Sequence, residues 1–372
     1  MLIGVDASRL GVSARTGTEH YTWELLQALG EVDRHNRYLL YCNGLPQVVP
    51  PLPPSFVLRS IPLPRAWSHG RLSLEMLLHA PDLLFVPAHA LPIVPPRRSV
   101  VTIHDLGFLH HPEAHTRVQR IYYRLFTRLS ARRATRIIAI SEATKRDLQR
   151  FYGTPAEKIA VIYHGVHARF KPIADRALLD QVQQRYGIAQ PYLLFVSTIQ
   201  PRKNVSRLIE AFAQARALLG AAQMPLLVLA GKRGWMTEQI ERRADDLGVA
   251  DQVRFVGYVH DADLPALLSG ALAYLMVSLY EGFGMTVLEA QACGTPVIAS
   301  NVSSLPEVVG DAGLLVDPYD VVSMRDAIVR LVQDANLRAE LRERGLHHAV
   351  DWTWERTARQ TLAVLEDAGH SA

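Results

Sequence analysis

Two successive series of short apolar runs, each alternating with helical patterns, constrain the fold of this 372-residue chain more than any other feature. The runs are rich in Val, Ile and Leu and are bounded by Gly, Pro or polar residues, as buried strands are. The first series gives candidate strands at 2–5, 38–42, 83–86, 100–103, 137–140 and 159–163. The second series gives candidate strands at 192–196, 226–229, 253–255, 273–277, 297–298 and 314–316. Strands separated by helices pair in parallel, so each series predicts a doubly wound α/β domain of Rossmann type.

A break in this rhythm separates the two series. The sequence K-P-I-A-D within Arg169–Asp175 interrupts the alternation, so we place the end of the first domain at residue 170. A chain of this length exceeds one ordinary hydrophobic core, which also favours two domains. Ligands of open α/β sheets bind at the carboxyl ends of the strands. Two such domains facing each other would therefore enclose a cleft.

The composition is that of an ordinary globular protein, with 49% hydrophobic and 20% charged residues. No apolar run reaches the roughly 18 residues that a transmembrane helix needs. The N-terminal M-L-I-G-V-D lacks a basic region and is interpreted as a first strand rather than a signal peptide. Cys42 and Cys293 are interpreted as reduced core residues, and we expect a cytoplasmic enzyme. A formal charge of +4 allows an anionic ligand or a membrane surface, and no nucleic-acid partner is expected.

One stretch combines a strand end, a Gly-rich turn and a helix: S-L-Y-E-G-F-G-M-T-V-L-E-A-Q-A-C-G-T-P-V-I-A, residues 278–299. The first N–H groups of a helix lack partners within it, and the helix dipole favours negative charge there, so such a turn can bind phosphate. Glu281 and Glu289 flank the turn. Because a carboxylate would repel a phosphate, we expect both to accept hydrogen bonds from hydroxyl groups. Backbone donors beside carboxylate acceptors indicate a nucleotide-sugar.

Two segments of the first half also adjoin the predicted ligand. Gly17 and Thr18 precede a helical pattern, where a glycine admits close approach of a diphosphate or sugar and Thr18 can cap the helix; an ordinary turn explains Gly17 equally well. His104 and Asp105 follow the strand 100–103, at the end where ligands bind. A neutral imidazole could bond a sugar hydroxyl while Asp105 orients it or binds an acceptor hydroxyl. The alternative is that this pair caps a loop.

In the second half, Arg202 and Lys203 follow the first strand and open a helix, a position that suits a diphosphate. Tyr258 and Val259 end another strand and could form part of a pocket for the base. The D-A-D sequence Asp261–Asp263 could clamp a metal on a diphosphate, but an N-cap role before the next helical pattern explains it more simply. We therefore predict no metal site.

Arginines recur at intervals of three and four along a helical pattern at 118–131: Arg117, Arg120, Arg124, Arg128 and Arg132. The apolar residues of the pattern are Val118, Ile121, Leu125 and Leu129. Such a basic amphipathic helix could contact anionic lipid or a lipid-diphosphate acceptor. A charged helix face that meets only solvent is the ordinary alternative.

The two glutamates, with seven residues between them, resemble the E-x7-E signature of the family-four retaining glycosyltransferases of GT-B fold. Arg202-Lys203 after a strand, His104 after an N-terminal strand, Gly17 in the first loop and I-Y-H-G-V before the linker fit that family in the same order. The resemblance covers nearly the whole chain. It implies an acceptor-side domain at 1–170, a nucleotide-sugar domain at 171–350, and a helix at 351–372 that crosses back to the first domain.

By this resemblance, Glu289 would bind the ribose, Glu281 the donor sugar, and His104 the transferred sugar near the reacting face. His104, Glu281 and Asp105 form the predicted catalytic set. The predicted donor-binding residues are Gly17, Thr18, Arg202, Lys203, Tyr258, Val259, Gly282, Phe283, Gly284, Met285, Thr286 and Glu289. Many members carry an arginine four residues before the basic pair, where this chain has Thr198. Diphosphate binding therefore depends more on Arg202, Lys203 and backbone amides.

The predicted function is metal-independent transfer of a hexose, with retention, from a nucleotide-sugar to an acceptor hydroxyl in polysaccharide or glycolipid assembly, without a cofactor. The resemblance favours GDP-mannose as donor and a UDP-glucose donor second. The acceptor would be a saccharide or lipid-linked saccharide, and the arginine helix could contact the inner membrane face peripherally. One alternative is a nucleotide-sugar epimerase of the same fold, against which the glutamate and basic pairs argue. The other is a non-catalytic binding subunit, against which the intact glutamates and His104 argue.

Overall fold

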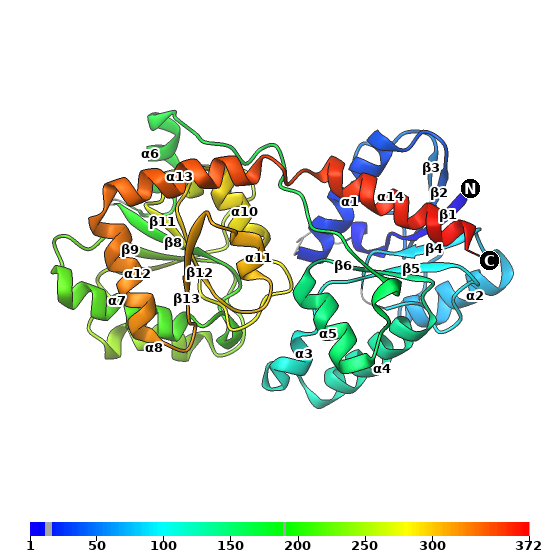
Figure 1. Ribbon diagram of the computed structural model, residues 1–372, viewed down its shortest axis with the longest axis horizontal. Helices are drawn as coiled ribbons and strands as arrows, with labels where there is room; N and C mark the ends of the chain where they lie inside the picture. The colour runs from blue at the N-terminus through cyan, green and yellow to red at the C-terminus, as the bar shows by residue number, and fades with distance from the viewer. Residues whose placement is uncertain (12–16, 89, 189–190, 372) are drawn as a thin grey trace. The chain divides into compact units, whose positions relative to one another are not determined.

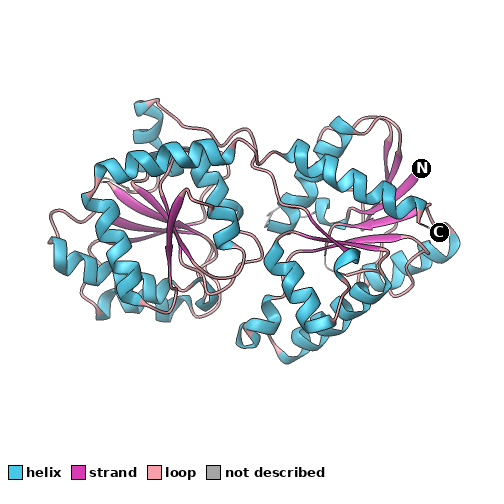
Figure 2. Ribbon diagram, in the orientation of Figure 1, coloured by secondary structure: helices cyan, strands magenta, loops and turns pink. Residues whose placement is uncertain are grey.

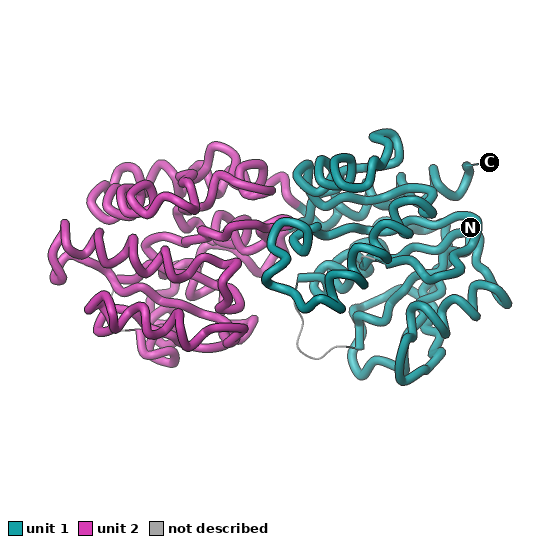
Figure 3. The backbone as a smooth tube through the Cα atoms, turned by 90° about the horizontal axis from the view of Figure 1, so that it is seen from below, with its two compact units in different colours: residues 1–165, 353–372 teal, residues 166–352 magenta. Residues whose placement is uncertain are grey.

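The computed structural model describes residues 1–11, 17–88, 90–188 and 191–371, and they form two compact units. Unit 1 comprises Met1–Gly165 with Thr353–Ala372, and unit 2 comprises Val166–Trp352 (Figure 3). The domain ends proposed from the sequence, after residues 170 and 350, differ from these by a few residues. The chain thus leaves unit 1 once and returns to it with its last helix.

Unit 1 is built on a seven-stranded sheet in the order β3-β2-β1-β4-β5-β6-β7, with every neighbouring pair parallel (Figure 2). Its strands are β1 (Leu2–Asp6), β2 (Arg37–Cys42), β3 (Phe56–Ser60), β4 (Leu83–Val86), β5 (Ser99–Ile103), β6 (Arg136–Ala139) and β7 (Ile159–Val161). Every residue of β4 and β5 is buried, because a parallel sheet is covered on both faces. The strand order reverses between β1 and β4, which is where ligand sites of such sheets form.

Helices cover this sheet, and the last helix of the chain is one of them. The helices of unit 1 are α1 (Gly17–Val32), α2 (Leu72–Leu78), α3 (Gly107–His110), α4 (Arg117–Arg133), α5 (Glu142–Tyr152) and α14 (Trp354–His370). α14 packs along α1 and reaches β4, β5 and β6 (Figure 1). The Thr353 side chain caps α14, and the Thr357 hydroxyl donates to the Tyr163 carbonyl at 2.8 Å. α14 is therefore an integral part of unit 1.

Unit 2 repeats the architecture with a six-stranded parallel sheet in the order β10-β9-β8-β11-β12-β13. Its strands are β8 (Tyr192–Val196), β9 (Leu226–Ala230), β10 (Val253–Gly257), β11 (Ala273–Met276), β12 (Val297–Ser300) and β13 (Gly313–Val316). Its helices are α6 (Arg176–Arg185), α7 (Val205–Leu219), α8 (Thr237–Asp246), α9 (Leu264–Gly270), α10 (Met285–Ala292), α11 (Leu305–Val309), α12 (Val321–Gln333) and α13 (Ala335–Ala349).

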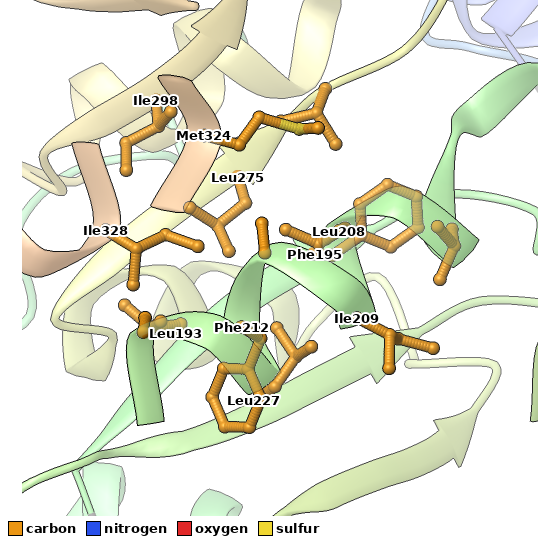
Figure 4. Packing of buried hydrophobic residues seen from close by; sticks show 14 of the residues in the cluster. Leu193, Phe195, Leu208, Ile209, Phe212, Leu227, Leu275, Ile298, Met324 and Ile328 are labelled. Atoms are coloured by element: carbon orange, nitrogen blue, oxygen red, sulfur yellow. The ribbon is translucent and has the colours of Figure 1, made fainter. Parts of the chain in front are cut away.

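The core of unit 2 holds its central strands in place. Phe195 of β8 and Leu275 of β11 are fully buried among Phe212 of α7 and Met324 and Ile328 of α12 (Figure 4). Burying side chains of this size stabilises the fold by roughly 1.5–3 kcal/mol each. The core therefore fixes the strands from whose carboxyl ends the candidate site is built.

The doubly wound α/β architecture predicted from the sequence is confirmed for both units. β3 is the exception, because no strand was predicted there. Its sequence, F-V-L-R-S, follows a Pro-rich segment and forms the edge of the sheet, with Val57 49% exposed. An edge strand buries less apolar surface than a central one, so its apolar signal in the sequence is weak.

The two places where the chain passes between the units are tied together locally. The Val166 N–H donates to the Trp352 carbonyl at 2.8 Å. Beside it, a Cβ added to Gly165 would lie 2.2 Å from the Trp354 backbone nitrogen. Any larger residue at Gly165 would push the start of α14 away, so glycine is required by this close approach.

Candidate functional site

The carboxyl ends of two neighbouring strands of unit 2 bring Arg202, Lys203 and Glu281 together. The short helix Pro201–Lys203 follows β8, and Glu281 follows β11, which pairs with β8. Lys203 Nζ lies 2.5 Å from Glu281 Oε1, and Arg202 Nη1 lies 3.6 Å from Glu281 Oε2. Glu281 is only 8% exposed. Three residues that the sequence predicted as site residues thus form one cluster.

The environment of Glu281 keeps its carboxylate charged. Burial alone would raise the pKa of Glu281, but the charges of Lys203 and Arg202 and the hydrogen bonds from Lys203 and Ser278 lower that pKa below its ordinary value of 4.5. Two cations and one anion leave the cluster with a net charge of one positive unit. The cluster can therefore accept hydrogen bonds at Glu281 and still attract a phosphate.

Two serines after β12 fix the turn that carries Glu281. The Glu281 N–H donates to Ser303 Oγ at 2.9 Å. Ser304 Oγ donates to the Glu281 carbonyl at 2.9 Å and to the Phe283 carbonyl at 2.7 Å, and Ser304 is fully buried. Ser303 has a φ of 55°, a left-handed conformation that a non-glycine residue rarely adopts without surrounding support. The serines hold the backbone of the Gly-rich turn in place.

The Gly-rich turn leads into the N-terminus of α10. Gly284 has a φ of 110°, and a Cβ added there would lie 2.8 Å from a methyl carbon of Leu305, so only glycine fits. Gly282 and Phe283 are buried, while Met285 and Thr286 are half-buried in the first turn of α10. α10 begins at Met285, four residues after Glu281, so its first N–H groups lie at the end of this turn, as an anion site at a helix N-terminus requires.

Tyr274 of β11 connects this helix to the sheet. Its hydroxyl lies 2.7 Å from Thr286 Oγ1 and 3.3 Å from the Val196 carbonyl. Burial raises the pKa of Tyr274 well above its ordinary value, and the charges of Glu289 and Glu281 raise it further. The fields of both glutamates thus reach one buried phenol. Glu289, half-buried on α10, belongs to the same region of unit 2 as Glu281.

The basic pair is held by backbone contacts. Arg202 Nη1 donates to the Tyr280 carbonyl at 2.5 Å, and the Leu279 N–H donates to the Arg202 carbonyl at 2.9 Å. Asn204, buried and left-handed with a φ of 61°, donates from Nδ2 to the Val277 and Pro318 carbonyls. The turn after β8 and the turn after β11 are therefore one hydrogen-bonded unit.

The segment after β10 places Tyr258 and Val259 differently. Tyr258 is 46% exposed beside Lys232, whose Nζ lies 5.1 Å from the ring centroid, whereas Val259 is buried. The N-cap position predicted for one of the two aspartates is confirmed at Asp263, which precedes α9, although its side chain makes no cap hydrogen bond. Asp263 instead forms an ion pair with Arg185 at 2.7 Å, and Asp261 accepts from the Tyr258 hydroxyl.

His104 lies in unit 1 within a buried cluster of rings. Its Nε2 is 2.7 Å from the Pro87 carbonyl, and its ring meets that of Tyr21 edge-on at 4.9 Å between centroids. His164, after β7, lies 4.8 Å from Tyr21 and 5.7 Å from Trp354. Burial lowers the pKa of His164 well below 6.5, and His104 lowers it further. Neither His164 nor Tyr21 is among the site residues predicted from the sequence.

The other predicted residues of unit 1 have local roles. Asp105 Oδ1 accepts from the Gly107 N–H at 2.8 Å, which is the loop-capping alternative for this residue. Gly17 is exposed and begins α1, so Thr18 is already the second residue of the helix. The predicted N-cap role of Thr18 is therefore wrong; its carbonyl accepts from the Thr22 hydroxyl within α1.

The described residues contain no group of three or more His, Cys, Asp or Glu side chains that could hold a metal ion. Within the same part of the chain, no helix is both long and apolar enough to span a membrane.

Comparison with known proteins defines the class. The family described as "Glycosyltransferase Family 4" matches residues 15–170, and "Glycosyl transferases group 1" matches residues 181–348. The O-antigen chain mannosyltransferase B of Escherichia coli is 34% identical over 289 residues, which span 77% of this chain and 73% of that protein. The O-antigen chain mannosyltransferase RfbU of Salmonella typhimurium is 27% identical over 88% of this chain and 90% of that protein.

Solved structures share the fold of this chain over nearly its whole length. Sucrose-phosphate synthase from Thermosynechococcus elongatus superposes with a TM-score of 0.80 at 22% identity, covering 98% of both chains. Anabaena HepE in complex with UDP-glucose gives a TM-score of 0.77 at 18% identity, covering 98% of this chain and 99% of that one. The protein is a glycosyltransferase of GT-B fold. It belongs to the family-four glycosyltransferases.

Proposed function

We propose that this enzyme transfers a hexose from a nucleotide-sugar to an acceptor hydroxyl in polysaccharide or glycolipid assembly. The observation that carries the proposal is the charged Glu281 beside Lys203 and Arg202, on the turn that leads into the N-terminus of α10. Phosphate groups need positive charge and N–H donors, whereas sugar hydroxyls need acceptors. Unit 2 offers both within one hydrogen-bonded pair of turns.

The charged and aromatic residues predicted to bind the donor in unit 2 divide its parts among them. Lys203, Arg202 and the first N–H groups of α10 would hold the diphosphate, and Glu289 would accept from the ribose. Glu281 would accept from hydroxyls of the transferred sugar. Tyr258 and Val259 would contact the base, with the half-exposed Tyr258 ring as its stacking surface. When the donor binds, Lys203 would be shared between Glu281 and a phosphate oxygen.

The proposed reaction retains the configuration of the sugar. The bond between the anomeric carbon and the phosphate oxygen breaks, the acceptor oxygen bonds to that carbon on the same face, and the acceptor proton passes to the leaving phosphate. Arg202, Lys203 and the end of α10 would stabilise the charge that develops on the diphosphate, so no metal is required. Glu281 would position the sugar rather than attack it, because its carboxylate is engaged by Lys203. His104 and Asp105 would act on the transferred sugar and the acceptor.

Mannose from GDP-mannose is the proposed donor sugar, with UDP-glucose as the second choice. Similarity to two O-antigen chain mannosyltransferases supports mannose, and the fold shared with a HepE–UDP-glucose complex supports the second choice. We propose a saccharide or lipid-linked saccharide as acceptor, and a cytoplasmic location at or near the inner membrane face.

The test measures release of nucleoside diphosphate from GDP-mannose, UDP-glucose and ADP-glucose in the presence of EDTA. We expect fastest turnover of GDP-mannose, and a loss of at least about 100-fold in Glu281→Ala and in Glu289→Ala, or about 2.7 kcal/mol of transition-state stabilisation each. Glu343→Ala, at an exposed glutamate of α13, is the matched control and should keep full activity. NMR of the product should show the anomeric configuration of the donor.

Other outcomes would replace the proposal. Conversion of one nucleotide-sugar into another without release of diphosphate would indicate an epimerase. A donor that raises the thermal midpoint but is never turned over, even with saccharide acceptors, would indicate a binding subunit. If no donor binds and Glu281→Ala changes nothing, the assignment of the site is wrong.

A further inference from the structure

The segment that follows β10 carries Tyr258 and is tied at its start to the neighbouring turns of unit 2. The Gly257 carbonyl accepts from the Gly231 N–H, which follows β9, at 2.7 Å. The Ile199 N–H, which follows β8, donates in turn to the Lys232 carbonyl at 2.9 Å. The turns after β8, β9 and β10 are therefore connected by backbone hydrogen bonds, and the first of them leads to the basic pair of the candidate site.

The end of the same segment is held by a tyrosine from another element. Tyr186 occupies the C-cap position of α6 and is half-buried. Its hydroxyl accepts from the His260 N–H at 3.1 Å and donates to Asp263 Oδ2 at 2.8 Å. A phenol can donate one hydrogen bond and accept others, so this hydroxyl joins the backbone at His260 to the start of α9.

The carboxylate that receives this hydrogen bond is buried and charged. Asp263 is 6% exposed, and Arg185 Nη1 lies 2.7 Å from each of its two oxygens. Burial alone would raise the pKa of Asp263, but the hydrogen bonds from Tyr186 and Arg185 and the charge of Arg185 lower that pKa below its ordinary value of 3.8. The bond from Tyr186 is therefore made to an ionised acceptor, which strengthens it.

The ring of Tyr258 is oriented by contacts within unit 2. Its hydroxyl donates to Asp261 Oδ1 at 3.2 Å, and Lys232 Nζ lies 5.1 Å from the ring centroid. The residue is nevertheless 46% exposed. An oriented and accessible aromatic ring is a surface on which a planar base can stack. Its place relative to the phosphate-binding groups depends on how firmly the two ends of the segment are held.

We propose that Tyr186 is a positioning residue for the base of the donor. Its hydroxyl fixes the backbone two residues beyond Tyr258, and thereby sets the ring on which the base stacks. The inference rests on the proposed function, because it needs Tyr258 to contact a base. A segment that is ordered before the ligand arrives does not lose its conformational entropy on binding, so more of the contact energy appears as affinity.

The substitution Tyr186→Phe removes both hydrogen bonds and keeps the ring. Calorimetric titration in EDTA compares GDP, UDP and ADP with inorganic pyrophosphate, which probes the phosphate-binding groups without a base. We expect the nucleotide that binds most tightly to lose about tenfold in affinity, the contribution of one hydrogen bond to a charged group, while pyrophosphate binding is unchanged. The KM for the nucleotide-sugar should rise by a similar factor, with kcat unchanged, because binding is weakened and the chemical step is not.

Two variants separate positioning from a general loss of stability. Tyr152→Phe makes the same substitution in unit 1, at a buried hydroxyl that has no hydrogen-bond partner among the residues the structure describes, and should change neither affinity. Arg185→Gln breaks the ion pair with Asp263 but leaves Tyr186 bonded to the backbone at His260. It should lower the thermal midpoint without changing the ratio of nucleotide affinity to pyrophosphate affinity.

The ratio of the two affinities decides the inference. If Tyr186→Phe leaves this ratio unchanged, or if Arg185→Gln lowers it as much as Tyr186→Phe does, Tyr186 merely stabilises unit 2 and the inference is overturned. A parent protein that binds none of the three nucleotides more tightly than pyrophosphate would instead contradict the proposed function, because no base would be recognised.

Discussion

Replacing Lys203 by methionine tests how Glu281 is kept charged inside unit 2. The side chains of Lys203 and Glu281 are 10% and 11% exposed, with 2.5 Å between Nζ and Oε1. Removing one partner of a buried ion pair costs about 3–5 kcal/mol, because the remaining charge is left without compensation. Arg202 stays 3.6 Å from the other carboxylate oxygen and offsets part of this loss. We therefore expect Lys203→Met to lower the free energy of unfolding by the lower end of this range, about 3 kcal/mol at pH 7.

The loss should depend on pH in a defined direction. In the parent protein the pKa of Glu281 is lowered from 4.5, so its contribution to stability is present above pH 4.5 and is lost as the pH falls through the lowered value. In Lys203→Met, burial should raise the pKa of Glu281, so the folded state is weakened as the pH rises through the raised value. The deficit is therefore largest near neutral pH and shrinks on acidification.

Urea denaturation at pH 7 and pH 5, followed by circular dichroism, measures both effects. The two units should be fitted as separate transitions, because a chain of two units need not unfold in one step. The double variant Lys203→Met/Glu281→Leu removes both charges and should recover more than half of the lost stability. A deficit below about 1 kcal/mol, the range of exposed ion pairs, would refute the account of a buried, coupled carboxylate.

Three further predictions concern single positions. Ser304→Ala should lower the free energy of unfolding by about 1–2 kcal/mol in urea and raise the KM for the nucleotide-sugar, because the carbonyls of Glu281 and Phe283 lose the hydroxyl that donates to them. The control is Ser300→Ala, which removes a buried hydroxyl that has no hydrogen-bond partner among the described residues and should cost less than about 0.5 kcal/mol. Gly165→Ala should lower the thermal midpoint by several degrees, about 2 kcal/mol, whereas Gly70→Ala, whose Cβ would meet its nearest neighbour at 3.5 Å, should change it little. His164→Phe should make the free energy of unfolding depend less on pH below pH 6.5. Because the pKa of His164 is lowered in the folded state, the neutral ring contributes its full stability above pH 6.5, and this stability is lost as the pH falls, at up to about 1.4 kcal/mol per pH unit. An unchanged acid slope in that variant would contradict the neutral state assigned to this histidine.

The periodicity of apolar residues was enough to predict both sheets, because central parallel strands are buried on both faces. The segment 83–86 became β4 without change, and 100–103 became β5 with one added residue. β3 was not predicted because it lies at the edge of the sheet with several of its side chains partly exposed to solvent. A strand in that position does not need a long run of apolar residues, so the sequence carries little signal for it.

The candidate site was predictable where chemistry and position in the chain coincide, as at Glu281 and Lys203. Ser304 and Asn204 could not be predicted in this way, because serine and asparagine are common in loops of every kind. Their importance depends on which backbone carbonyls the fold brings near them. Thr18 shows the opposite error: a good capping residue before an apolar pattern predicted a helix start, but the helix begins at Gly17.

The double passage between the units sets an order for biosynthesis. Unit 2 is one continuous segment, Val166–Trp352, and has every strand and helix it needs once that segment has left the ribosome. Unit 1 begins first but needs α14, whose residues are made after unit 2. Until then the surface of α1 that packs on α14 stays uncovered. Translation therefore completes the unit encoded second before it can complete the unit encoded first.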